Sequence, residues 1–192
     1  MGGLTSTNRA AYGQHDVELA ALAAAGDRRA FGELVRRHNP GVRGLLMRMG
    51  ADPSTADDVA QDAFLTAFSR ISEFRGEGAF AGWVKRIAAR QYVRGWRRRN
   101  GEVLESEAEE GSGGGEAHAA SRIDLDDALR TLSPAERMCV SLCYGAGFSH
   151  AQAAEALNTP LGTVKSHVKR GLDKLRVRLA APGGEAQERA NV

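Results

Sequence analysis

Apolar residues recur three and four positions apart along most of this chain, which is the spacing of one face of an α-helix. In the segment near the C-terminus, one arc of about 100° on a helical wheel holds the apolar side chains; these are Val164, Val168, Leu172, Leu175 and Leu179. No stretch alternates apolar and polar residues with the β-branched enrichment of a strand. The pattern therefore predicts an all-α protein.

Capping signals support the helix starts. A Ser or Thr stands three positions before an acid or amide in three places: Thr55 with Asp58, Ser133 with Glu136, and Ser149 with Gln152. Pro134 occupies a first helical turn, and Thr159–Pro160 offers a cap followed by proline. Together these signals predict helices near 17–25, 28–38, 41–49, 56–71, 79–99, 122–132, 134–144, 150–157 and 160–179.

The stretch "NGEVLESEAEEGSGGGEAHAAS" interrupts this pattern. It is rich in Gly, Ser and Glu and has almost no large apolar side chain, so burial cannot offset the entropy lost on ordering it. We expect two small helical domains, 1–100 and 122–181, joined by a flexible acidic linker over 101–121. Residues 182–192 are expected to form a disordered tail.

Charge is segregated although the formal net charge is only +2. The segment 80–99 holds seven basic residues and no acid, whereas 102–116 holds six Glu and no basic residue. Such segregation predicts surfaces of opposite sign.

The segment "SHAQAAEALNTPLGTVKSHVKRGL" predicts a helix-turn-helix: a short alanine-rich helix, a tight connection and a longer basic helix. Its second helix has the position of a recognition helix, whose first turns suit phosphate and base contacts. The side chains expected to be exposed there are Thr163, Lys165, Ser166, His167, Lys169 and Arg170. A solvated amphipathic helix that happens to be basic remains the alternative for this segment alone.

Two segments of the first domain stand out. In "ADDVAQDAFLTAF", Asp57, Asp58, Gln61 and Asp62 cluster opposite the apolar side and could dock on a basic protein surface, although acids near a helix start also suit the helix dipole. In "FAGWVKRIAARQYVRGWRRRN", arginines are interleaved with aromatic residues, a combination that suits unpaired nucleic acid bases. A core helix with a basic outer face is the alternative, and we assign Trp83 mainly to packing.

Other functions find no support. The chain has no nucleophile–base set, phosphate loop or metal-ligand cluster, so we expect no enzyme activity, no cofactor and no metal. No run approaches the ~20 apolar residues of a membrane span, and no direct membrane insertion is expected. Cys139 and Cys143 are expected to be small buried apolar residues, which suits a reducing cytoplasm.

Four motifs, in this order, resemble those of bacterial RNA polymerase sigma factors of the extracytoplasmic-function (ECF) type. They are "GDRRAFGELVRRH", "ADDVAQDAFLTAF", "FRGEGAFAGWVKRIA" and "LSPAERMCVSLCYGAGFSHAQAAEALNTPLGTVKSHVKRGLDKLR". The resemblance covers about 17–179. It implies a stress-response transcription factor that binds core RNA polymerase and directs promoter-specific initiation on the nucleoid in the cytoplasm.

The resemblance also implies roles for individual residues. The first domain is similar to sigma region 2, with Asp58, Gln61, Asp62 and Leu65 expected to meet the β′ coiled coil. The residues expected to open and hold the −10 element are Arg75, Phe80, Lys85, Arg86, Arg90, Arg94, Arg97 and Arg98. The second domain is similar to region 4, whose recognition helix reads the −35 element through the six residues named above and touches the polymerase β flap.

Three positions depart from the family pattern: many members have Asn at Arg90, Asp at Arg94 and Arg at His167. These changes bear on the promoter sequence that is recognised rather than on the class of protein.

An anti-sigma partner is a further expectation of the resemblance. Two alternatives stay open at this point, namely a conventional dimeric repressor or activator that binds duplex DNA alone, and a sigma-like decoy that binds an anti-sigma protein instead of DNA.

Overall fold

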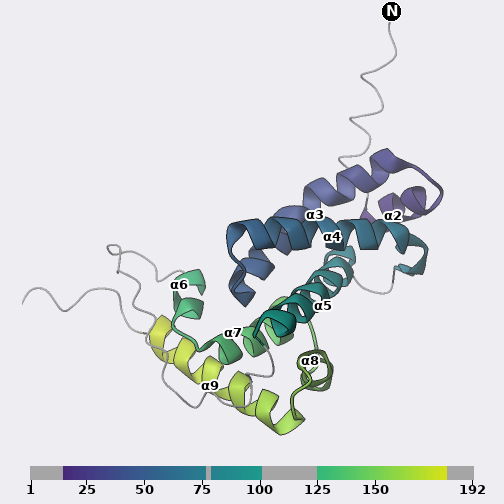
Figure 1. The fold of residues 1–192 in the computed structure, drawn as a ribbon. Helices are drawn as coiled ribbons and strands as arrows, with labels where there is room; N and C mark the ends of the chain where they lie inside the picture. The colour runs from purple at the N-terminus through teal and green to yellow at the C-terminus, as the bar shows by residue number, and fades with distance from the viewer. Residues whose placement is uncertain (1–14, 77–78, 101–124, 181–192) are drawn as a thin grey trace, which may run out of the picture. The chain divides into compact units, whose positions relative to one another are not determined.

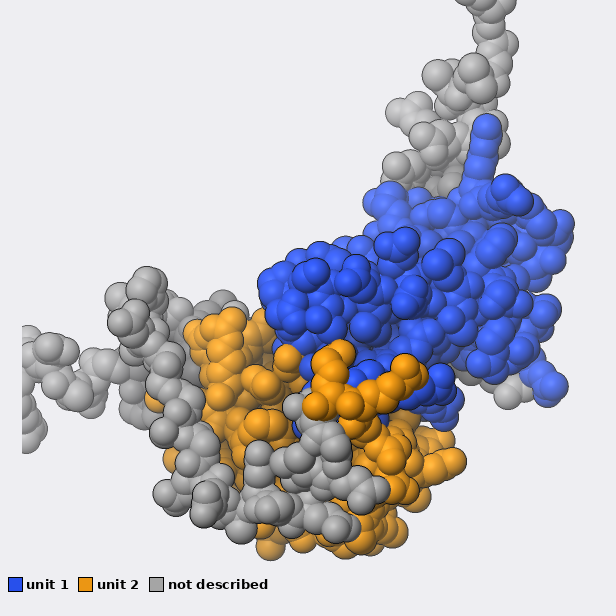
Figure 2. All heavy atoms as spheres, viewed as in Figure 1, with its two compact units in different colours: residues 1–47, 51–96 blue, residues 48–50, 97–192 orange. Residues whose placement is uncertain are grey.

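The computed structural model describes residues 15–76, 79–100 and 125–180 of the chain, and every regular element in these ranges is helical. The prediction of an all-α protein is therefore confirmed for the part that the structure describes (Figure 1). The chain divides into two compact units, residues 1–47 with 51–96 and residues 48–50 with 97–192 (Figure 2). The predicted linker, 101–121, and the predicted tail lie outside the described residues.

The helices of the first unit begin with α2 (Asp16–Ala24) and α3 (Arg28–Met49). They continue with α4 (Pro53–Ser69), a 3₁₀ turn η2 (Ile71–Glu73) and α5 (Phe80–Asn100). The prediction of two separate helices at 28–38 and 41–49 is wrong, because α3 runs through Pro40 without a break. Proline inside a helix costs about 3 kcal/mol. Burial of Leu34 before Pro40, and of Val42 and Leu46 after it, supports helix on both sides.

The start of α4 also differs from the prediction. The cap is Asp52, whose carboxylate accepts hydrogen bonds from the Thr55 backbone N–H (3.0 Å) and from the Thr55 hydroxyl (2.6 Å). Pro53 then occupies the first turn, where its missing N–H is not needed. The expected pairing of Thr55 with Asp58 is wrong because Thr55 already lies inside the helix.

The interior of the first unit is built from one face of each long helix. Leu19, Leu34, Leu46, Val84 and Val93 are at most 1% exposed. Gln91 of α5 donates a hydrogen bond to the Thr66 hydroxyl of α4 (2.9 Å) and so ties the two helices together. The opposite faces of α4 and α5 are exposed to solvent. These exposed faces carry most of the charged side chains of the two helices.

The second unit contains α6 (Leu125–Arg130), α7 (Pro134–Val140), a π-helical turn η4 (Ser141–Gly145), α8 (His150–Leu157) and α9 (Leu161–Ala180). Both predicted capping boxes are confirmed, Ser133 with Glu136 at α7 and Ser149 with Gln152 at α8. The predicted Thr159 cap is wrong, since its hydroxyl donates to the Leu157 carbonyl (3.3 Å) instead.

The core of the second unit gathers Ala128, Leu129, Leu132, Val140 and Leu175, with Leu172 packed against it. α7 and α9 approach closely, because a Cβ added at Gly171 would lie 2.8 Å from a methyl group of Val140. α8 also packs on α9. Asn158 ends α8 in the left-handed conformation (φ 52°), which Asn tolerates better than most residues. The predicted helix-turn-helix is present as α8 and α9.

Two smaller expectations concern the cysteines and membranes. Cys139 is buried as expected, and burial raises the pKa of its thiol to about 12. Cys143 is only partly buried. Among the described helices, none is long and apolar enough to cross a membrane.

Candidate functional site

The first surface lies on α4. Asp58, Gln61, Asp62 and Leu65 are all exposed and fall within about 100° around the helix. We call these four residues the acidic face. Leu65 is 60% exposed, so an apolar side chain stands beside the two carboxylates. The structure thus brings together all four residues that the sequence placed on a polymerase-binding surface.

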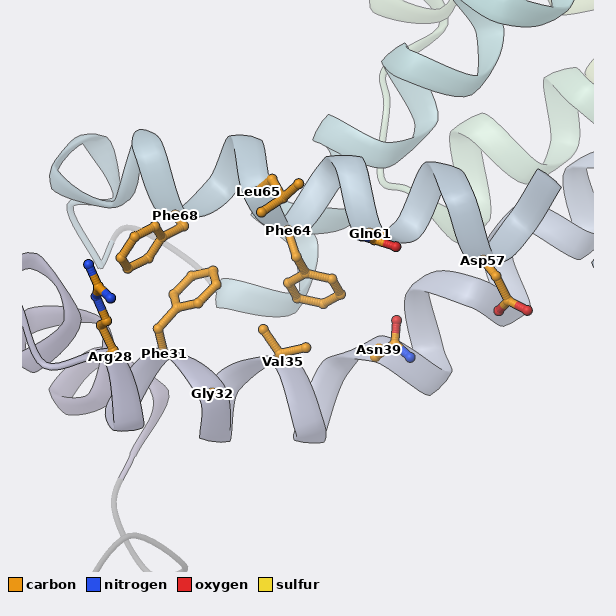
Figure 3. A pocket seen from close by; sticks show the side chains of 10 residues that line it. All are labelled: Arg28, Phe31, Gly32, Val35, Asn39, Asp57, Gln61, Phe64, Leu65 and Phe68. Carbon is orange, nitrogen blue, oxygen red and sulfur yellow. The ribbon is translucent and has the colours of Figure 1, made fainter. Parts of the chain in front are cut away.

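A groove of about 650 Å³ between α3 and α4 borders the acidic face (Figure 3). Phe31 and Val35 of α3 line one side, and Phe64, Leu65 and Phe68 of α4 line the other. The rings of Phe31 and Phe68 lie 4.9 Å apart between centroids. The opening is therefore apolar, with Arg28 toward one end and Asp57, paired with Arg43, toward the other.

The sequence showed no sign of the α3 side of this groove, and the helical pattern of "ADDVAQDAFLTAF" puts its last residue, Phe68, on the apolar side of the helix. Phe68 is in fact 38% exposed. Helical periodicity identifies the apolar side of each helix but not the strip that stays uncovered where two helices diverge. Arg28, Gly32 and Asn39 joined the groove only through the packing of α3 beside α4.

The second surface lies on α5. Arg86, Arg90, Arg94 and Arg97 fall within about 80° around the helix and form what we call the arginine stripe. The first three are exposed and Arg97 is partly exposed. Arg98 is exposed beside the stripe, and Arg75 is exposed in the segment before α5. This arrangement places a continuous positive strip on the solvent side of the helix.

Two residues predicted for the same surface do not lie on it. Phe80 is 1% exposed, and its ring packs 5.5 Å from Phe74 and 5.7 Å from Trp83 between centroids. Lys85 is partly exposed and lies about 100° around the helix from Arg86, and its Cε is 3.8 Å from where a Cβ of Gly41 on α3 would stand. The interpretation of Phe80 as a DNA-facing ring is therefore corrected: its ring belongs to the interior. Tyr92, also read as an exposed aromatic, is buried.

The third surface is the solvent side of the first turns of α9. Lys165, Ser166 and Lys169 are exposed, and we call them the outward face of α9. The Ser166 hydroxyl donates to the Gly162 carbonyl (3.0 Å), as serine often does inside a helix. Thr163 is partly buried at the edge of this face.

His167 differs from the other predicted −35 residues because it is only 5% exposed. The expectation that the first turns of α9 expose it is wrong. Its position lies between the outward face and the buried side of α9, and its Nδ1 stands 3.0 Å from a guanidinium nitrogen of Arg170. Burial, and then the neighbouring Arg170 charge, lower the pKa of His167, so the neutral ring is favoured.

Arg170 is therefore held from two sides. Its Nε lies 3.8 Å from a carboxylate oxygen of Glu136, which is itself only 5% exposed. The guanidinium remains 58% exposed and so stays available at the edge of the outward face. Across the described ranges, no group of three or more metal-binding side chains comes together.

The three surfaces lie within segments that match known protein families. Residues 34–102 match the family model of sigma-70 region 2, and residues 122–175 match that of sigma-70 region 4. The first match spans α4 and the arginine stripe, and the second spans the helix-turn-helix.

Individual relatives extend the similarity over most of the chain. The ECF RNA polymerase sigma factor SigE of Mycolicibacterium smegmatis is 32% identical over 183 residues, covering 89% of this chain and 71% of that protein. The ECF RNA polymerase sigma-E factor of Escherichia coli is 31% identical over 176 residues, covering 83% of this chain and 92% of that protein.

Among solved structures, the sigma factor RpoE of Bartonella quintana, crystallised with the anti-sigma factor NepR, shares the fold. It aligns with a TM-score of 0.50 and 24% identity over 79% of this chain and 97% of that one. The two region matches and the two relatives above 30% identity lead to one conclusion: this chain belongs to the family of ECF RNA polymerase sigma factors.

Proposed function

We propose that this sigma factor binds core RNA polymerase through the acidic face of α4 and the adjoining groove. Two carboxylates beside an exposed Leu65 and an apolar groove suit a partner helix that carries both basic and apolar side chains. The β′ coiled coil of the polymerase is the partner of this kind that the family resemblance indicates. Complementary charge then guides the encounter, and burial in the groove prolongs it.

The arginine stripe and Arg75 serve the −10 element. Arginines at helical spacing follow a phosphate backbone, and guanidinium planes stack on unpaired bases. Because Phe80 and Tyr92 are buried, we assign the stacking role to the arginines and to the partly exposed Trp96 rather than to those rings. Opening the duplex costs a few kcal/mol for each extracted base, which these contacts offset.

The outward face of α9 serves the −35 element. Lys165 and Lys169 are placed for phosphate or guanine contacts, with Ser166 between them, and Arg170 stands at the edge. The helix start adds its free N–H groups and dipole. The distal basic residues of α9 then remain for the polymerase β flap.

The remaining assignments follow from this division. Residues 1–100 form the region 2 domain and 122–181 the region 4 domain, with 101–121 as the tether and 182–192 as a tail. The protein is a non-catalytic initiation subunit that acts on the nucleoid in the cytoplasm. An anti-sigma factor controls it, as NepR binds the RpoE of Bartonella quintana.

One observation carries this proposal: α4 has an acidic face with an apolar groove beside it, and two other helices, α5 and α9, have basic faces. The two basic helices belong to different compact units. The test is transcription in vitro with purified core RNA polymerase on fragments of the source genome, with start sites mapped. We expect transcripts from a subset of promoters only when the polymerase and this chain are both present. No gain in specific initiation over core polymerase alone would overturn the proposal.

The same preparation separates the two rival functions. A conventional repressor or activator binds duplex DNA by itself as a dimer, and a decoy binds an anti-sigma protein but leaves core polymerase inactive. We expect instead that tight, sequence-specific promoter binding by the full chain requires the polymerase.

A further inference from the structure

The first of the described helices, α2, packs on η2, directly before the segment that leads into α5. This contact between α2 and η2 does not belong to any of the three surfaces described above. It lies, however, next to residues that the proposed function uses, because Arg75 is assigned to the −10 surface and α5 carries the arginine stripe. The question is what holds α2 there and what its position does to that segment.

Asp16, the first residue of α2, is the polar anchor. Its carboxylate lies 2.7 Å from Nε2 of His38 and 3.3 Å from a guanidinium nitrogen of Arg37, both on α3. Arg37 is in turn fixed by Glu33, whose carboxylate accepts from its Nε at 2.7 Å. The side chains of Asp16, Arg37 and His38 are between 18% and 28% exposed. Water therefore shields this contact less than it shields an ion pair on the surface.

Val17, the next residue, reaches the segment before α5. A Cβ built on Gly76 would lie 3.4 Å from one methyl group of Val17 and 3.8 Å from the other. Gly76 has a φ of +74°, which larger residues rarely adopt. The backbone at Gly76 thus turns sharply against the side chain of Val17, and α2 forms one wall of this turn.

His38 connects the same anchor to the other side of the turn. Its ring centroid is 5.4 Å from that of Phe80, the first residue of α5. The Phe80 ring packs against Phe74, which stands just before Arg75. One imidazole therefore contacts Asp16 through its nitrogen and packs at a tilt of 45° against the ring of Phe80 at the start of α5.

We propose that Asp16 and His38 are positioning residues for −10 recognition: they lock α2 in place, and α2 sets the backbone of Phe74–Gly76 and with it the direction of Arg75. The inference rests on the proposed function, because it takes Arg75 to face the −10 DNA. Asp16 and His38 themselves touch no nucleic acid. They act through Val17, Phe80 and Phe74.

The test compares Asp16→Ala with Glu18→Ala, which removes an exposed acid two positions along on the same helix. Hydrogen exchange in the full chain is the first readout, since the Phe74 amide donates to the Ile71 carbonyl (3.1 Å) and the Glu73 amide to that of Arg70 (2.9 Å). We expect Asp16→Ala to speed exchange at these two amides on the order of fivefold to tenfold, with Glu18→Ala at the wild-type rate. Unchanged exchange in Asp16→Ala would overturn the proposal.

The second readout is transcription initiation by the full chain with core polymerase. It uses a promoter library that is randomised in the −10 element. Asp16→Ala is expected to alter the ranking of −10 sequences while leaving the affinity for core polymerase unchanged. An unaltered ranking, or an equal loss on every promoter with weakened core binding, would contradict the proposal. If the wild type itself shows no −10-dependent initiation, the proposed function fails, and the exchange readout still decides the role of α2.

Two further variants guard against a general loss of folding. Asp16→Asn keeps an oxygen acceptor for His38 and Arg37, and it should restore part of the slow exchange. Val17→Ala keeps the anchor but removes the methyl groups beside Gly76, and its side chain is 51% exposed, so the fold should tolerate it. We expect Val17→Ala to alter the ranking of −10 sequences without releasing α2. If the ranking stays the same as in the wild type, the side chain of Val17 does not hold the turn at Gly76.

Discussion

The ammonium group of Lys174 on α9 lies 2.9 Å from a carboxylate oxygen of Glu136 on α7. The Glu136 side chain is 5% exposed, and the same oxygen accepts the Ser133 backbone N–H at 3.1 Å. One carboxylate therefore completes the capping box of α7 and holds α9, the helix whose outward face we assign to the −35 element. This relationship links the local folding of α7 to the placement of the recognition helix.

Removal of Glu136 should destabilise the second unit. For Glu136→Ala we expect a loss of about 2 kcal/mol, because the capping contact and the pairing of Lys174 disappear together. Glu136→Gln should lose less, since the amide oxygen still accepts the Ser133 N–H. Native-state hydrogen exchange of α7 and α9 amides measures both. Lys169→Met, an exposed lysine on the same helix, is the control and should change stability by less than about 0.5 kcal/mol.

His167 should make the second unit sensitive to acid. Its pKa is lowered in the folded state, chiefly by burial and then by Arg170, with Glu136 acting in the opposite direction. Below the ordinary pKa of 6.5 the unfolded chain therefore takes up more protons than the folded one. The stabilisation that neutral His167 contributes is fully present above pH 6.5, and it is lost as the pH falls through the lowered pKa of His167 in the folded state.

His167→Gln should remove this part of the pH dependence. Calorimetric melting at pH 7.5 and pH 5.5 compares the variant with the wild type, and an imidazole NMR titration checks that the pKa of His167 is low. An equal drop in melting temperature for both proteins would show that His167 is not responsible.

Gly171→Ala should destabilise the crossing of α7 and α9. Alanine favours helix over glycine by about 1 kcal/mol, but the new methyl group would meet Val140 at 2.8 Å. Overpacking of this kind costs about 1–3 kcal/mol, so a net loss is expected. Gly162→Ala is the matched control on the same helix, with no atom within 4 Å of its new Cβ. Exchange of α9 amides measures both, and the double variant Gly171→Ala with Val140→Ala should recover part of the loss.

Asp62→Arg should weaken binding to core polymerase by about tenfold or more, because it reverses a charge at the centre of the acidic face. Fluorescence anisotropy of the labelled full chain with purified core polymerase measures the affinity. Glu18→Arg, which reverses an exposed acid on α2, is the control for the charge change itself and should leave core affinity close to that of the wild type. Equal affinities for Asp62→Arg and the wild type would remove the assignment of the acidic face.

Lys165→Ala should reduce initiation at promoters that depend on the −35 element. If Lys165 contacts a phosphate, the slope of log affinity against log salt concentration should become shallower by about 1, so the defect is greatest at low salt. Arg130→Ala on α6 is the matched control, because Arg130 is exposed, pairs with Asp127 (3.1 Å) and belongs to none of the three surfaces. A loss confined to −10-dependent activity would mean that α9 does not read the −35 element.

The pattern of residues alone determined the all-α class, the two capping boxes at Ser133 and Ser149, and the helix-turn-helix. These features depend on contacts between residues three or four apart, which helical periodicity states directly. The same periodicity placed Asp58, Gln61 and Asp62 on one side of a helix, and the family resemblance added Leu65. Their exposure followed because the opposite side of α4 is rich in alanine and phenylalanine.

Only the tertiary structure decided which side chains near the edges of those faces are covered. Phe80 and His167 stand at borderline positions on their helices. The ring of His38 on α3 packs against Phe80, and the packing of α9 on the other helices of the second unit covers His167, so both side chains are removed from solvent. Pro40 stays inside a helix because α3 buries apolar side chains both before and after it, and the groove beside Leu65 exists because α3 and α4 leave a strip between them uncovered. Such outcomes depend on residues far apart in the chain, whose proximity no local spacing encodes.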